Sequence, residues 1–359
     1  MSENKKMELF LAAINPFIQS NSVDNTEKKI SGKDFISWGT DNKYPQFLLG
    51  LYNDCTTLQS VINGISDYVT GDEVVCNIPG FDIAVNKNGD TIDDLIQKIV
   101  FDYLIFGSFA IQVIRNFNGG VAELYWIDIN KLRSDEKNEV FFYSDDWSKS
   151  FGRVKTLKYP KFNPKDNNPS SIFYYKGNKT RSVYGIPLWS AAVKNVQIET
   201  KITDYHLNEI DNNFMTSKLI SFNNGIPNDE QKLEIEKNLN EKFGGAENAG
   251  RVMISFSESR DNSPEVMSLG TDDFADRYNT LAKRNKEEIY CAFRCTPLLM
   301  GLVSESNGFA TSEYSDSYKL FNKTVIEPIQ KIIIKSFDKI FGTKESVTIT
   351  PFTITFENN

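Results

Sequence analysis

Few residues in this chain could do covalent chemistry, and no GxSxG elbow or dinucleotide-binding fingerprint accompanies them. The chain contains a single histidine, His206, so a metal site built from several histidines of one chain is excluded. A serine–histidine–aspartate system would have to use this residue, which lies inside a long helical pattern. We interpret His206 as a residue on a helix surface.

Two further features invite a catalytic interpretation. Gly245 and Gly250 have the glycine spacing of a phosphate-binding loop, but the lysine that reaches phosphate and the serine or threonine that holds magnesium are missing. The pair Asp272 and Asp273 fits the positive end of a helix dipole. A nucleotide-dependent or hydrolytic enzyme therefore stays a weak alternative. We predict no enzyme, with no catalytic, cofactor-binding or metal-binding residue.

Composition narrows the class of protein. The 359 residues carry a net charge of −8, with 40% hydrophobic and 25% charged side chains, which is typical of a folded chain of two to three modules. No apolar run is long enough to span a membrane, and Met7 to Ile14 is too short for a signal peptide. Four cysteines predict a reducing compartment, and we expect Cys291 and Cys295 to be core thiols.

The first half of the chain predicts an α+β unit. We expect a short helix up to Asn15 and then an extended arm. Apolar periodicity predicts helices over Tyr44 to Thr70 and Thr91 to Phe106, the second capped by Thr91. Alternation around Asn118-Gly119 predicts a hairpin of Ser108 to Arg115 with Val121 to Ile127. Further strands are expected at Val140 to Tyr143 and Ser171 to Tyr175.

Two long helices dominate the second half. One is expected over Pro187 to Met215, and the other begins at the cap Thr271 and ends at Thr296-Pro297. They flank a strand–helix–strand–strand insert, Ser217 to Leu269, whose helix is capped by Asn228 and Gln231. Because the first helix has a narrow apolar stripe and many charges, we expect it to need neighbours outside its own globule.

The remaining segments predict a loop, a helix and a strand. The loop spans Gly301 to Thr311, and the helix carries Pro328, which should kink it, and closes at Phe341-Gly342. Val347 to Phe356 alternates like a terminal strand.

This order of elements resembles the portal proteins of tailed bacteriophages over about residues 40 to 340. Four motifs carry the resemblance: Tyr184-Gly185-Ile186-Pro187-Leu188, Phe222-Asn223-Asn224-Gly225-Ile226-Pro227, Phe243 to Arg251, and Ile289 to Gly301. Cys295, Thr296 and Met300 depart from the family pattern of the last motif.

The resemblance implies a portal-like α+β fold of six parts. A wing would span 1–186, the first stem helix 187–216, an α/β clip 217–270 and the second stem helix 271–297. A channel loop would span 298–312. The helix and strand of 313–359 would complete the wing and a small crown.

The resemblance also implies a function and partners. The chain would form a homo-oligomeric ring, expected to be a dodecamer, at the unique capsid vertex through which double-stranded DNA is packaged and ejected. Partners would be DNA bound non-specifically, the terminase large subunit, the major capsid protein and the head–tail connector, without a membrane. It would reside in the virion, and in the host cytoplasm during assembly. A head–tail adaptor or another ring-forming structural virion component is the alternative.

The acidic balance suits a conduit, because strongly basic walls would hold DNA through its phosphates. Sparse cations on a net negative wall would allow sliding. The expected channel-lining residues lie on the second stem helix and in the loop: Lys283, Arg284, Lys286, Ser304, Glu305, Ser306 and Asn307.

Overall fold

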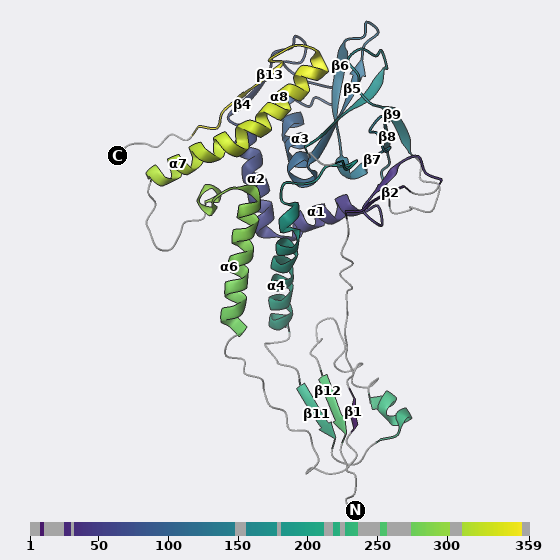
Figure 1. Cartoon of the computed structure of the whole chain (residues 1–359), viewed down its shortest axis with the longest axis vertical. Coiled ribbons are helices and arrows are strands. Elements are labelled where there is room, and N and C mark those ends of the chain that lie inside the picture. Colours follow the sequence, from purple (N-terminus) through teal and green to yellow (C-terminus); the bar gives the residue numbers. More distant parts are fainter. Residues whose placement is uncertain are drawn as a thin grey trace, which may run out of the picture. The chain divides into compact units, whose positions relative to one another are not determined.

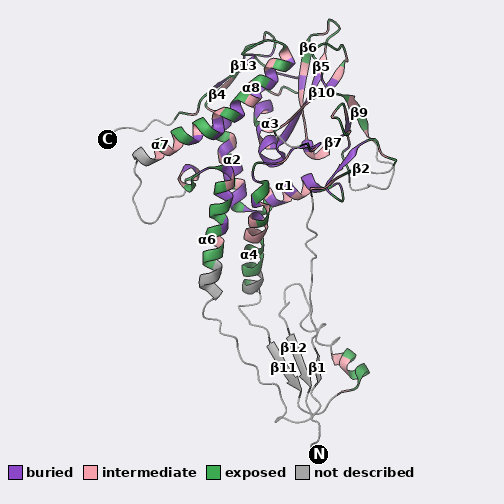
Figure 2. Cartoon of the chain, viewed as in Figure 1, coloured by how far each residue is buried: buried purple, intermediate pink, exposed green. Residues whose placement is uncertain are grey.

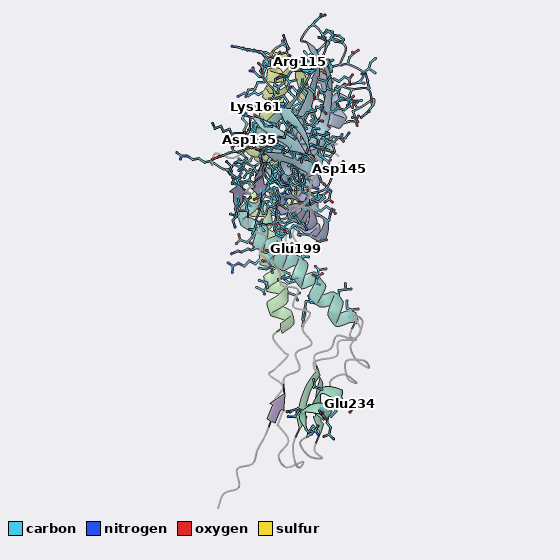
Figure 3. All side chains as sticks on the ribbon, turned by 90° about the vertical axis from the view of Figure 1, so that its right-hand side faces the viewer. Arg115, Asp135, Asp145, Lys161, Glu199 and Glu234 are labelled. Carbon is cyan, nitrogen blue, oxygen red and sulfur yellow. The ribbon has the colours of Figure 1, made fainter. Side chains whose placement is uncertain are left out.

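The computed structural model describes residues 8–10, 25–29, 32–147, 156–177, 181–211, 218–222, 227–235, 252–256, 274–301 and 311–353. The chain divides into two compact units (Figure 1). The smaller unit joins Met1–Asn21 to Glu199–Lys283, and the larger joins Ser22–Ile198 to Arg284–Asn359. Figure 3 labels Glu199 on helix α4, where the smaller unit begins in the middle of that helix.

Three helices begin the larger unit: α1 (Tyr44–Asp54), α2 (Thr56–Thr70) and α3 (Ile92–Phe106). The single helix expected over 44–70 is interrupted at Cys55, whose backbone is extended. The expected cap of α3 is confirmed. The Thr91 hydroxyl accepts a hydrogen bond from the Asp94 amide at 3.1 Å, and the Asp94 carboxylate accepts one from the Thr91 amide at 2.8 Å.

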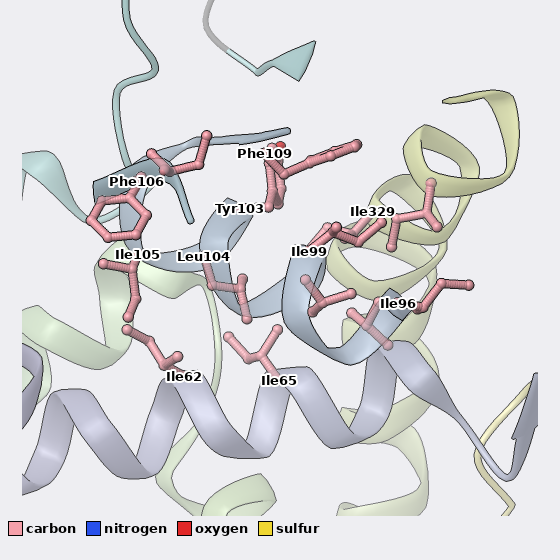
Figure 4. Close-up of a cluster of buried hydrophobic side chains, with 14 of the residues drawn as sticks. Ile62, Ile65, Ile96, Ile99, Tyr103, Leu104, Ile105, Phe106, Phe109 and Ile329 are labelled. Atoms are coloured by element: carbon pink, nitrogen blue, oxygen red, sulfur yellow. The ribbon is translucent and has the colours of Figure 1, made fainter. Parts of the chain in front are cut away.

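The core of the larger unit lies where α2 and α3 pack together and against α8 (Glu327–Phe341). Figure 4 shows Ile62 and Ile65 of α2 facing side chains of α3, with Ile329 of α8 beside them. These side chains are almost completely excluded from solvent. Burial of each isoleucine contributes about 1.5–3 kcal/mol, so this cluster holds the unit together.

Short antiparallel sheets cover this core. The predicted hairpin is confirmed as β5 (Ser108–Arg115) and β6 (Val121–Ile127), and β10 (Ser170–Lys176) pairs with the other edge of β5. The remaining strands form three groups: β7 (Leu132–Ser134), β8 (Val140–Tyr143) and β9 (Leu157–Pro160); β2 (Glu27–Lys29) and β3 (Ile36–Trp38); β4 (Glu73–Cys76) and β13 (Val347–Thr350).

The C-terminal helical segment contains a π turn at its proline. Helix α7 (Thr311–Phe321) runs into the π turn η5 (Asn322–Ile326), and α8 follows with Pro328 at its start. Proline has no backbone N–H for the helical ladder, and a π turn is one way a helix absorbs that defect. The predicted end at Gly342 is confirmed, whereas the last strand stops at Thr350. Residues 354–356 of the expected strand lie outside the described residues.

The smaller unit contains a three-stranded sheet. Strands β11 (Lys218–Phe222) and β12 (Val252–Phe256) are parallel, and β1 (Glu8–Phe10) pairs antiparallel with β12. The helix over 229–235 has the predicted cap, with reciprocal hydrogen bonds of 2.9 and 3.2 Å between Asn228 and Gln231. The expected strand 265–269, the helix end at 244–245 and the cap Thr271 lie outside the described residues.

The prediction of an N-terminal helix is wrong at Glu8–Phe10. A helix this short is marginal in water, and the hydrogen-bonding groups of the β12 edge offer the same residues a pairing partner. The contacts also group Met1–Asn21 with the smaller unit. The boundaries of the six expected parts, with a wing over 1–186, stay predictions.

Within the described residues, the first long helix begins later and the second ends earlier than expected. Helix α4 (Val193–Asp211) begins after a 3₁₀ turn, η2 (Ser190–Ala192), and α6 spans Phe274–Phe293. Residues 212–215 lie outside the described residues. No helix of the described segments is long and apolar enough to cross a membrane.

The segment leading to α4 crosses the end of α3 at very short range. Gly107 has φ +70°, and a Cβ there would collide with the backbone of Ile186. A Cβ on Gly185 would lie 2.6 Å from the carbonyl oxygen of Phe106. Packing therefore explains the glycine in the motif Tyr184-Gly185-Ile186-Pro187-Leu188, because two backbones meet where only glycines fit.

We expect Gly107→Ala to lower the melting temperature by roughly 10 °C or more, since it adds a backbone collision to left-handed strain. Gly342→Ala is the matched control: Gly342 also ends a helix with positive φ, but nothing lies within 4 Å of its Cβ position. It should lose only about 2–4 °C. Thermal melting of both variants checks this, and equal losses would contradict the crossing as the cause.

Candidate functional site

The two long helices are anchored in the larger unit by their buried ends. Before α4, Trp189 is fully buried, and its indole Nε1 donates to the Leu104 carbonyl at 3.0 Å. Val196 of α4 and Ile289 of α6 are also fully buried. These contacts fix where each helix joins the larger unit.

A pair of side-chain amides joins the anchored ends of α4 and α6. The Asn195 side-chain nitrogen donates to the Asn285 side-chain oxygen at 3.1 Å; Asn285 is only 2% exposed, whereas Asn195 is half-buried. Because a hydrogen bond between amides is directional, the pair favours one relative rotation of the two helices. Sequence reasoning missed this contact. Its signal was present, because Asn285 interrupts the apolar stripe between Leu281 and Ile289.

Away from this anchor the two helices are solvent-exposed over most of their described residues (Figure 2). The exposed residues include large apolar side chains. On α4, Tyr205 is 40% exposed, and Leu207 and Ile210 are each 57% exposed; on α6, Leu281 is 39% exposed. A single exposed apolar residue is ordinary, but several along a helix are typical of a contact surface.

These apolar residues lie on different sides of α4. Successive residues of an α-helix are rotated by about 100°, so Tyr205 and Leu207 point about 200° apart. Ile202 lies near the Tyr205 side, and Ile210 lies near the Leu207 side. Together the four residues spread over about 200° of the α4 surface, with Tyr205 and Leu207 at its two edges, which we call the Tyr205 side and the Leu207 side.

The predicted channel cations are exposed but do not form one row. Lys283, Arg284 and Lys286 are all exposed on α6, together with Glu287 and Glu288. Arg284 and Lys286 point about 200° apart, and Lys283 lies between them around the helix. The structure therefore does not bring the three cations to one face. Ser304, Glu305, Ser306 and Asn307 lie outside the described residues.

The features that suggested catalysis gain no support from the geometry. His206 is exposed on α4 beside the Tyr205 ring. Residues 245–251 and both aspartates at 272 and 273 lie outside the described residues. Within the described segments, no group of three or more histidine, cysteine, aspartate or glutamate side chains is placed to hold a metal ion.

Two cysteines, Cys291 on α6 and Cys295 just after its end, differ in burial. Cys295 is buried, and desolvation raises the pKa of its thiol to about 12, so it stays protonated. This confirms it as a core thiol. The same prediction is wrong for Cys291, which is exposed because it lies on the opposite side of the helix from Phe293.

One family model matches most of the chain. Residues 85–354 match the family described as phage portal protein. A chain of the virion of a native gene transfer agent particle is similar, with 13% identity, a TM-score of 0.56 and coverage of 86% of this chain and 84% of that chain. A chain in the neck of the native particle, computed with C12 symmetry, gives 15% identity, a TM-score of 0.54 and the same coverage.

An HK97-family phage portal protein from Corynebacterium diphtheriae aligns with 11% identity and a TM-score of 0.49, covering 81% of this chain and 88% of that chain. No curated protein matches the sequence. At these identities the solved structures show the fold alone, and the family rests on the sequence match.

We expect Asn285→Ala to destabilise the larger unit by about 0.5–1.5 kcal/mol, because it removes the hydrogen bond that Asn285 accepts from Asn195. Lys286→Ala, at the exposed neighbouring position, is the control and should change stability by less than about 0.5 kcal/mol. Denaturant unfolding of the two variants measures the difference. Equal stability of both variants would show that the amide pair contributes little.

Proposed function

Since the chain belongs to the phage portal protein family, we propose that its ring is the passage through which double-stranded DNA enters the capsid during packaging and leaves during ejection. The protein is a ring-forming structural component of the virion and not an enzyme. The family assignment also decides against a head–tail adaptor.

The two-sided exposure of α4 is the observation that carries the proposal. A subunit of a closed ring contacts one neighbour on each flank, and the two flanks are different surfaces. The Tyr205 side and the Leu207 side of α4 are two such surfaces on one helix. Packing of α4 between two neighbouring copies would cover apolar area that a single copy leaves in water.

The subunit number is proposed to be twelve. The neck structure with a similar chain was computed with C12 symmetry, which supports this number for the present chain. Assembly is proposed to take place in the host cytoplasm. The proposed partners are the terminase large subunit, the major capsid protein and the head–tail connector, and no membrane is involved.

We propose that DNA contacts in the channel are few and non-specific. The candidate lining residues are Lys283, Arg284 and Lys286 on α6 and residues 304–307. Because exposed Glu287 and Glu288 directly follow these cations, the wall would attract phosphate weakly and would not hold it. Lys283 lies between the other two around the helix, so it would share a side with whichever of them faces the DNA.

We expect Leu207→Asp to abolish rings while leaving the fold of each copy intact, because it places a charge in an apolar contact between copies. Negative-stain microscopy measures the rings, and circular dichroism with thermal melting measures the fold. Ile83→Asp, at another exposed apolar residue, is the control and should still give rings. A wild-type protein that stays monomeric at micromolar concentration would refute the proposed function.

We expect Lys283→Glu to weaken binding of assembled rings to double-stranded DNA and to reduce the salt dependence of the affinity by about 0.9 for each phosphate that is no longer neutralised. Only one of Arg284→Glu and Lys286→Glu should have the same effect, because they point to different sides. Fluorescence anisotropy at several salt concentrations measures this. Lys137→Glu, an exposed lysine in the turn between β7 and β8, is the control. Unchanged binding by all three variants would remove these cations from the channel wall.

A further inference from the structure

Helix α2 contacts both chain segments that border residues 302–310, which contain the candidate channel residues 304–307. On one border lies the 3₁₀ turn η4 (Pro297–Met300), and on the other lies α7. Both borders approach the same turn of α2, close to Tyr68.

The phenol of Tyr68 contacts both borders. Its hydroxyl donates to the Leu299 carbonyl oxygen at 2.9 Å, and its oxygen lies 3.0 Å from the Tyr314 hydroxyl. A carbonyl only accepts, so the Tyr68 proton points to Leu299 and Tyr314 must donate to Tyr68. The result is a relay from α7 through α2 to η4, with Tyr68 in the middle.

A second contact seats η4 on the same helix. Gly64 lies one turn before Tyr68, and a Cβ there would come within 2.6 Å of the Met300 sulfur. The missing side chain therefore makes room for Met300 against α2. Leu299 itself is buried, so η4 is packed as well as hydrogen-bonded.

The ring of Tyr68 is held independently of its hydroxyl. It packs against Phe352 at 5.1 Å, Tyr318 at 5.5 Å and Phe321 at 6.0 Å between ring centroids. Desolvation raises the pKa of Tyr68, so its hydroxyl keeps its proton at physiological pH. A phenylalanine at this position would keep the packing and lose both hydrogen bonds.

We propose that Tyr68 is a positioning residue that couples the two borders of residues 302–310, so that η4 and the start of α7 hold one fixed separation. The role of this coupling in DNA passage rests on the proposed function. The coupling itself does not, because all its contacts lie within the larger unit.

Hydrogen exchange of assembled rings tests the coupling. In Tyr68→Phe, exchange of the amides in 297–301 and 311–318 should speed up together by about tenfold, because both hydrogen bonds are removed. Tyr314→Phe removes only the Tyr314 link and should give a smaller rise, about fivefold, mainly in 311–318. It also tests the coupling if the first variant fails to fold.

Tyr318→Phe is the matched control. Tyr318 lies on α7 in the same aromatic cluster, but its hydroxyl donates to the Phe352 carbonyl at 2.7 Å and takes no part in the Tyr314–Tyr68–Leu299 relay. It should leave exchange in 297–301 unchanged. If Tyr68→Phe behaves like Tyr318→Phe, the coupling is overturned. Equal acceleration across the whole larger unit would also overturn it, because it would mean general destabilisation.

A DNA packaging assay on capsids built with the same rings and supplied with the terminase separates the coupling from the proposed function. We expect Tyr68→Phe rings to assemble normally and to package DNA at least about threefold more slowly, with Tyr318→Phe unaffected. Faster exchange with normal packaging would confirm the coupling and refute its role in DNA passage. Wild-type rings that package no DNA would refute the proposed function and leave the exchange result standing.

Discussion

The crossing of two backbones at Gly107 and Ile186 is the constraint on which the arrangement of the larger unit depends. There α3 ends and the segment leading to α4 begins, with no space for a side chain between them. Trp189 then inserts into the core and bonds to the last turns of α3 through Leu104. Because α3 is itself packed in the core with α2 and α8, the start of α4 is held in place by the whole core.

Beyond this anchor the long helices change from buried to solvent-exposed over most of their described residues. The hydrogen-bonded pair Asn195–Asn285 orients α4 and α6, but further along the helices few side chains are covered. Exposed apolar residues on two sides of α4 are unfavourable for a single copy in water and favourable between two copies. A portal ring resolves this conflict, since each subunit has neighbours on both flanks. A single copy therefore covers the apolar residues of its core but leaves apolar residues of its long helices exposed to water.

Helix α2 links the core to η4 and α7, the two segments that border the candidate channel residues 304–307. One face of it buries Ile62 and Ile65, and the same helix presents Gly64 and Tyr68 to η4 and α7. One helix can thus contact both borders of residues 302–310, η4 and α7.

The sequence by itself determined those elements whose signals are local. The Thr91–Asp94 and Asn228–Gln231 caps, the hairpin at Asn118-Gly119 and the end at Gly342 each depend on residues within a few positions of one another. Only the tertiary structure decided features that depend on a distant partner: Glu8–Phe10 became a strand because β12 offers an edge, and Asn285 finds its hydrogen-bond donor in Asn195 on another helix. The angular spread of Lys283, Arg284 and Lys286 follows from helix geometry, but which side meets the core is set by contacts far away in the chain.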